Sequence, residues 1–124
     1  MGVQKMEDYK NRSSALGRSN MAMATAYQAV NVAVLAIIVF GKIAEADDSI
    51  KRLVAFTAVI TAITAWMFSS NGLRIAENAA QDMTAAEAAT AAGKNGAGQP
   101  WKIYQLYTLA VTIASIVITL TAIY

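Results

Sequence analysis

The chain has 124 residues, of which 56% are hydrophobic and only 15% are charged, and its formal net charge is +2. Soluble domains carry about 25% charged residues, so this composition excludes an ordinary soluble domain and favours a single membrane domain over residues 1–124. The net charge is also too small for the basic surface that binds nucleic acid, and we expect no nucleic-acid partner.

Cysteine and histidine are both absent from the chain. Their absence excludes disulfides, thiolate or imidazole metal sites, haem ligation through either residue, and the nucleophilic triads that need one of them. All eight acidic residues lie outside the apolar segments, where solvated surface charge is their simplest interpretation. We therefore predict a non-enzymatic protein with no catalytic residue, no cofactor and no metal.

Residues 1–14 are polar, show no apolar period, and are predicted to form a flexible or partner-held arm. A serine at position 13 or 14 is the expected N-cap of the first helix. The first membrane span is predicted at 19–43, because 19–41 contains no charged residue. In lipid, a spanning segment satisfies its backbone polar groups most simply as a helix.

Small residues recur along the first span at alternating spacings of four and three. In lipid, such stripes let two helix backbones approach closely, so we predict a packing seam of Ala22, Ala26, Ala29, Ala33 and Ala36. Gln28 and Asn31 share a face of this helix and are predicted to hydrogen-bond across a helix interface. A polar lining for a pore or a ligand pocket is the alternative for these two amides.

A short charged connector leads to the second span, which is predicted at 53–73 and has no charged residue. As a helix it would be about 30 Å long, the thickness of a bilayer's hydrocarbon core. It repeats the small-residue seam, here formed by Ala55, Ala58, Ala62, Ala65, Ser69 and Gly72. Because 74–92 is rich in helix formers, we predict that this helix continues beyond the membrane to about residue 92.

The glycine- and proline-containing segment 93–100 is predicted to be a loop, and 103–124 is predicted to be the third span. Aromatic residues near span ends typically anchor at the membrane interface. We assign this role to Tyr27, Trp66, Trp101, Tyr104, Tyr107 and Tyr124. The predicted fold is thus an all-α membrane protein with three transmembrane helices, the second of which extends into water.

Lysine and arginine set the expected orientation. With three spans, the N-terminal segment and 74–102 lie on one side with seven basic residues, and the 42–52 connector lies on the other side with three. The positive-inside rule then places the N-terminus in the cytoplasm. We expect a bacterial inner membrane, or a membrane derived from one.

The expected function is structural: assembly, through the small-residue seams, with copies of the chain or with larger membrane subunits. In layout and composition, though without a diagnostic motif, the chain resembles conjugative pilins and integral proteins of membrane-containing virions. A pilin would lose its leader, which we expect this chain to retain. A holin-like pore former and an accessory subunit of a larger membrane complex are the alternatives.

Overall fold

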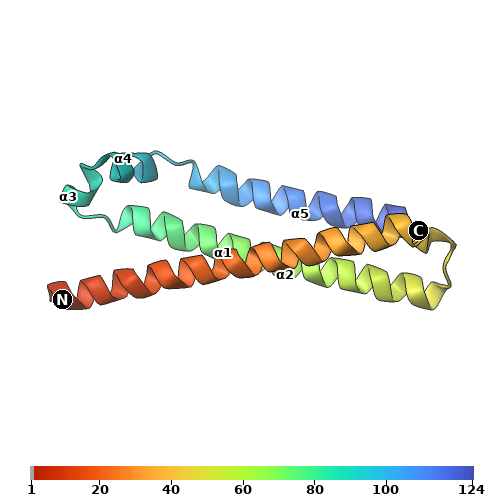
Figure 1. Ribbon diagram of the computed structural model, residues 1–124. Coiled ribbons are helices and arrows are strands. Elements are labelled where there is room, and N and C mark those ends of the chain that lie inside the picture. The colour runs from red at the N-terminus through yellow and green to blue at the C-terminus, as the bar shows by residue number, and fades with distance from the viewer. Residues whose placement is uncertain (1) are drawn as a thin grey trace.

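A computed structural model describes residues 2–124, and within them the chain is all-helical (Figure 1). The elements in order are α1 (Val3–Phe40), the 3-10 turn η1 (Ile43–Glu45), α2 (Asp48–Gln81), α3 (Ala85–Ala88), α4 (Ala91–Ala97) and α5 (Trp101–Ile123). By length and composition, α1, α2 and α5 could each cross a membrane. The predicted all-helical class with three such helices is confirmed.

Helix α2 lies in the middle of the molecule and packs against both of the other long helices. It runs antiparallel to α1 and crosses it near the centre, while α5 lies along its other side (Figure 1). Direct contact between α1 and α5 is slight. The molecule is therefore elongated: three long helices lie side by side, and within residues 2–124 no further long helix covers them.

The apolar core lies at the end of the molecule where α1 turns into α2. Here Val34 and Ile38 of α1 meet Ala55 and Ala58 of α2, and Ile123 of α5 is fully buried against them. The turn itself contains Lys42 in the left-handed region, with φ 50°. This single left-handed residue after α1 reverses the chain and begins the path to η1.

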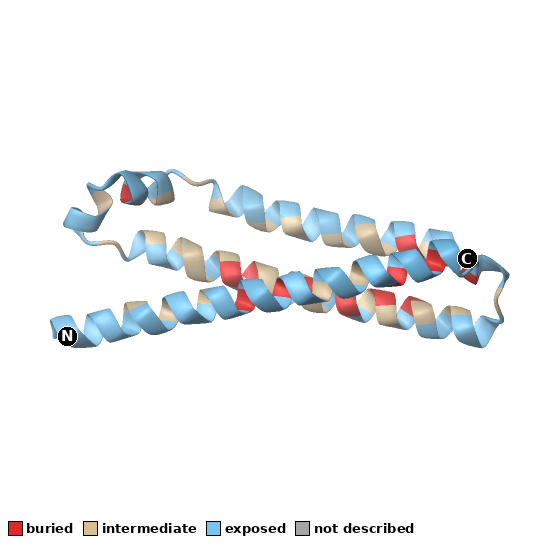
Figure 2. Ribbon diagram, in the orientation of Figure 1, coloured by how far each residue is buried: buried red, intermediate tan, exposed pale blue. Residues whose placement is uncertain are grey.

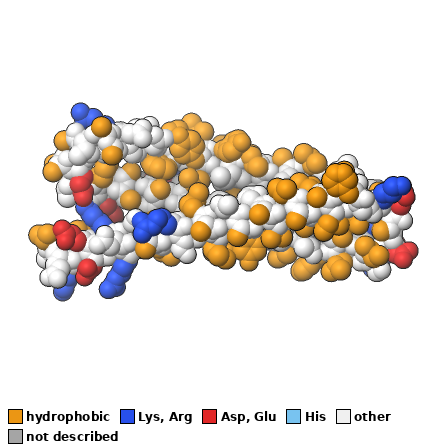
Figure 3. All heavy atoms as spheres, viewed as in Figure 1, with side chains coloured by type: hydrophobic (Ala, Val, Ile, Leu, Met, Phe, Trp, Pro, Cys, Tyr) orange, Lys and Arg blue, Asp and Glu red, His pale blue; other side chains and the backbone are white. Residues whose placement is uncertain are grey.

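Most residues of the three long helices are exposed, because no other part of the chain covers them (Figure 2). Large apolar side chains cover its middle, and charged side chains gather at the two ends (Figure 3). A belt of exposed apolar surface between two charged ends is the arrangement that a bilayer would cover.

Helix α1 begins at Val3, so the arm predicted for 1–14 is helical from its third residue and the expected serine N-cap lies inside the helix. Extending an existing helix is cheap, because the cost of nucleation falls on its first turn. The extension also gains contacts: Lys10, Ser13 and Gly17 are half-buried. They continue the stripe through which α1 packs on α2.

Helix α2 ends at Gln81 in place of continuing to about residue 92. Thr84 has extended backbone angles, φ −69° and ψ 163°, which a continuous helix does not allow. Its side chain instead caps a new helix in a capping box with Glu87. The T-x-x-E pattern at this position is the sequence signal for the break.

The predicted loop at 93–100 contains most of a second short helix, α4. Thr90, again with extended backbone, accepts a 3.0 Å hydrogen bond from the backbone N–H of Gly93 and so caps α4. Two threonine caps therefore divide 82–100 into two short helices that connect α2 to α5.

Candidate functional site

The α1–α2 interface contains two hydrogen bonds between side chains of different helices. The hydroxyl of Thr61 donates to Oδ1 of Asn31 over 2.7 Å, and Nδ2 of Asn71 donates to Oδ1 of Asn20 over 3.0 Å. Thr61 and Asn20 are both buried. Asn31 thus lies where an interhelical amide was predicted, whereas Gln28 is exposed on the surface of α1.

Asn20, Thr61 and Asn71 were not predicted as interhelical residues. The available signal was the spacing of Asn20 and Asn31: eleven residues is close to three full helical turns, so both amides lie on one face of α1. Ala24, Tyr27, Val34 and Ile38 complete that face at spacings of three and four. Tyr27 stacks on Phe68 of α2, with ring centroids 5.9 Å apart.

The seam predicted on α2 lies inside the molecule. Its small side chains face the neighbouring helices, and all are buried except the half-buried Ser69: Ala55, Ala58, Ala62, Ala65 and Gly72. At Gly72 the approach is close enough that an added Cβ would lie 2.7 Å from Sδ of Met21. Small residues here allow the close contact of α1 with α2.

The seam predicted on α1 lies on the outside of the molecule. Ala22 is two residues from both Asn20 and Ala24, which are buried, and two residues turn a helix by about 200°. The stripe therefore faces nearly opposite to α2, and each of its members is exposed: Ala22, Ala26, Ala29, Ala33 and Ala36. We call this exposed stripe the alanine face.

The outer face of α2 has a different character from the alanine face. It carries large apolar side chains at spacings of three and four, all exposed: Leu53, Phe56, Ile60, Ile63 and Met67. Bulky aliphatic and aromatic groups suit contact with acyl chains, whereas a stripe of small residues allows close approach of another helix. The two faces therefore suit different neighbours.

The aromatic residues predicted as interface anchors divide into two groups. Trp101, Tyr104 and Tyr107 lie in the first turns of α5, where Nε1 of Trp101 donates to the carbonyl oxygen of Gly96 over 3.2 Å. Tyr104 packs edge-on against Trp101, and Tyr107 and Tyr124 are exposed. Trp66 differs, because its Nε1 is buried and has no hydrogen-bond partner within residues 2–124.

A cleft of about 770 Å³ opens at the end of the molecule that carries the N-terminus. Ligand pockets typically span about 300 to 1,000 Å³, so its size is that of a binding pocket. Its walls come from the first half of α1, the second half of α2, and α3–α4, and are mostly apolar or small: Gly17, Met21, Gly72, Ile75, Ala76, Ala79, Met83 and Gly93. Lys10, Arg18, Asp82 and Glu87 supply its charged groups.

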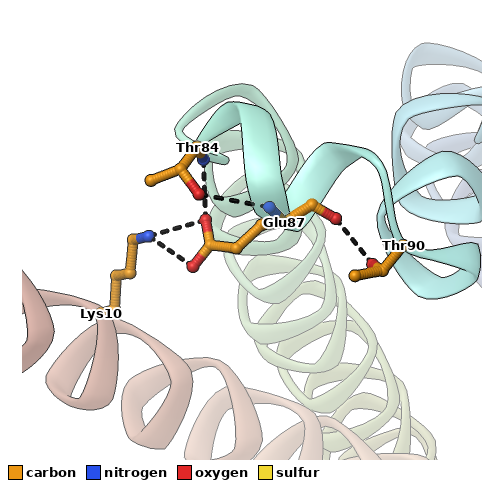
Figure 4. Close-up of polar contacts among 4 residues, drawn as sticks. All are labelled: Lys10, Thr84, Glu87 and Thr90. Atoms are coloured by element: carbon orange, nitrogen blue, oxygen red, sulfur yellow. Dashed lines mark hydrogen bonds and ion pairs between the residues drawn. The ribbon is translucent and has the colours of Figure 1, made fainter.

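The carboxylate of Glu87 joins two elements at the mouth of this cleft (Figure 4). Its oxygens accept hydrogen bonds from Nζ of Lys10 over 2.7 and 2.8 Å, and from the backbone N–H of Thr84 over 2.7 Å. These two donors, Lys10 first, lower the pKa of Glu87 from 4.5 to about 2. The carboxylate is therefore ionised at neutral pH.

Within residues 2–124 no group of three or more acidic side chains is placed to hold a metal ion. The hydroxyls of Thr57, Thr64 and Thr112 donate to carbonyl oxygens of their own helices. They form no polar face along the span.

Comparison of the chain with protein-family models, with curated proteins and with solved structures found no match. The fold and its surfaces define the class: an all-helical protein with three helices that are long and apolar enough to span a membrane.

Proposed function

We propose that this chain is a non-enzymatic structural protein of a bacterial inner membrane, or of a membrane derived from one, and that it assembles through the alanine face of α1. Its neighbours would be copies of itself or larger membrane subunits. The single observation behind this proposal is that α1 turns its small residues outward and uses a different face to contact α2.

Helices in lipid gain little from hydrophobic burial and associate through close packing instead. Contact with acyl chains does not require small residues, because lipid packs equally well on larger side chains. Close contact with another helix does require them. The stripe from Ala22 to Ala36 runs about 21 Å along the helix axis, enough for a helix–helix contact through most of a bilayer. These features support an intermolecular contact.

The alternative of a pore receives less support. A water-filled lumen calls for polar groups along its wall. In the spans, Asn31 and Thr61 pair between α1 and α2, and the hydroxyls of Thr57 and Thr64 bond to their own helix. We find no observation that favours catalysis, transport or an aqueous channel over assembly.

The test is the size of the complex after gentle extraction of two matched variants. Ala29→Leu fills the alanine face, and Ala114→Leu adds the same bulk at an exposed position near the middle of α5. We expect native mass spectrometry in mild detergent to show loss of the assembly for Ala29→Leu and retention for Ala114→Leu. Equal masses for wild type and both variants would contradict the proposal.

A further inference from the structure

The segment formed by α3 and α4 has little apolar surface with which to hold its position. Between residues 84 and 98, alanine is the only apolar residue larger than glycine. Burying a methyl group stabilises far less than burying a leucine or phenylalanine side chain. Yet this segment forms one wall of the cleft, through Glu87, Thr90, Ala92 and Gly93.

The segment packs against α2 through α4, and one polar side-chain contact joins it to α1. Within residues 2–124, the ion pair of Lys10 with Glu87 is the only hydrogen bond or ion pair between α1 and 82–100. It spans the cleft, because both residues line it from different elements. Figure 4 shows Lys10 reaching from α1 toward the carboxylate on α3.

The chain on each side of α3 is extended, at Thr84 and at Thr90. Each threonine caps the helix that follows it. The hydroxyl of Thr90 also donates to the carbonyl oxygen of Glu87 over 2.6 Å, so α3 and α4 are joined to each other and would move together. Hinges are commonly element-terminal residues, which absorb changes in φ and ψ. The segment can therefore turn as one unit about Thr84 at one end and about residues 98–100, which lead into α5, at the other.

We propose that α3–α4 is a hinged cover over the cleft and that the Lys10–Glu87 ion pair is the latch that holds it closed. Exposed ion pairs are weak and are screened by salt, so breaking the Lys10–Glu87 pair costs little free energy. Opening would further expose Ile75 and Met83, which line the cleft and are half-buried in the closed form. The inference concerns the polar end of the chain and does not depend on assembly through the alanine face.

The chain contains no cysteine, so a single introduced thiol reports on one position. We choose Ala76→Cys in the cleft wall, in the full-length chain in liposomes, and measure its rate of modification by an uncharged, water-soluble maleimide at neutral pH. Adding Lys10→Met removes the latch. Lys5→Met is the matched control, because Lys5 is exposed on α1 and has no ion pair within residues 2–124.

We expect Lys10→Met to raise the modification rate about twofold to fivefold, the range that exposed ion pairs support, while Lys5→Met leaves it unchanged. High salt should raise the rate for wild type and have no further effect on Lys10→Met. Lys10→Arg should keep the slow rate. Equal rates for Lys10→Met and Lys5→Met, or a rate insensitive to salt in wild type, would overturn the latch.

A second thiol distinguishes local opening of the cover from destabilisation of the whole helical bundle. Ala58→Cys lies in the buried core at the opposite end of the molecule. If the latch acts as proposed, the Ala58→Cys thiol stays unreactive in the Lys10→Met background. A parallel rise at both thiols would show that Lys10 stabilises the whole fold, and the cover would be rejected.

Discussion

The hydroxyl of Thr61 lies 2.7 Å from Oδ1 of Asn31 and joins α1 to α2 near the middle of the apolar belt. Thr61 is also 2.7 Å from the carbonyl oxygen of Thr57, so one hydroxyl connects the amide of one helix to the backbone of the other. Asn31 lies on the face of α1 that meets α2, and the alanine face points away from α2.

Breaking this contact should weaken the α1–α2 interface. Interhelical hydrogen bonds in membranes average about 0.6 kcal/mol and reach about 1.7, so we expect Asn31→Leu to lower the free energy of unfolding within that range. Thr64→Val is the control, because its hydroxyl bonds only to Ile60 of its own helix. A double-mutant cycle of Asn31→Leu with Thr61→Val, measured by unfolding in mixed micelles, should give a coupling energy above zero. Additive effects would show that the pair does not interact.

Gly72 should tolerate no large side chain. A Cβ there would lie 2.7 Å from Sδ of Met21 and 3.6 Å from Cβ of Asn20, so a leucine must displace the Met21 side chain and press against Asn20. We expect Gly72→Leu to cost about 1 to 3 kcal/mol, the usual cost of overpacking. The matched control is Gly96→Leu, where nothing lies within 4 Å of an added Cβ. Thermal unfolding in detergent measures both, and equal stabilities would contradict the close approach of the two helices.

The Lys10–Glu87 ion pair should hold the cover closed at neutral pH and release it at low pH, where Glu87 becomes protonated. Its pKa is lowered to about 2 in the folded chain, so the ion pair is fully formed above the ordinary value of 4.5 and is lost as the pH falls toward 2. Asp82 and Arg18 also line the cleft. Nitroxide labels at positions 6 and 95 should therefore give one narrow distance distribution at pH 7 and pH 5, and a broad one near pH 2.

The Lys10→Met variant is the control for this pH effect. It should give the broad distribution already at pH 7, with no further change down to pH 5. A narrow distribution for wild type at pH 2, or a transition near pH 6, would contradict the role of Glu87.

The two charged ends should lie on opposite sides of the membrane, with the cleft inside. Seven of the ten basic residues are in the segments at the cleft end, and the other three are in 42–52. In intact cells, an impermeant maleimide should label Asp47→Cys, and it should label Asn95→Cys only after lysis. Labelling of Asn95→Cys alone would reverse the orientation. Labelling of both without lysis would mean that the chain does not span the membrane.

Much of the fold could be predicted from where charges are absent. The three charge-free runs fixed the number and the approximate positions of the long helices, because apolar runs of this length have few other structures. The short helices at 82–100 were missed because alanine-rich sequence favours one long helix by propensity alone. The capping boundary at Thr84 overrides that weak preference locally.

The choice between the two faces of α1 could not be predicted from spacing. Both stripes of α1 have the same alternation of three and four residues, one through Asn20, Ala24 and Asn31, and the other through Ala22 and Ala29. What separates them is the partner available on α2: Thr61 and Asn71 satisfy the two amides. That information resides in the pairing of two helices and is absent from either one alone.

We propose that a protein neighbour covers the alanine face while lipid covers the outer face of α2. Photo-crosslinking in native membranes tests it directly, with a diazirine amino acid at Ile37, beside the alanine face, or at Ile60 on the outer face of α2. We expect protein adducts of higher mass from position 37 and lipid adducts from position 60. Lipid adducts alone from position 37 would contradict the account.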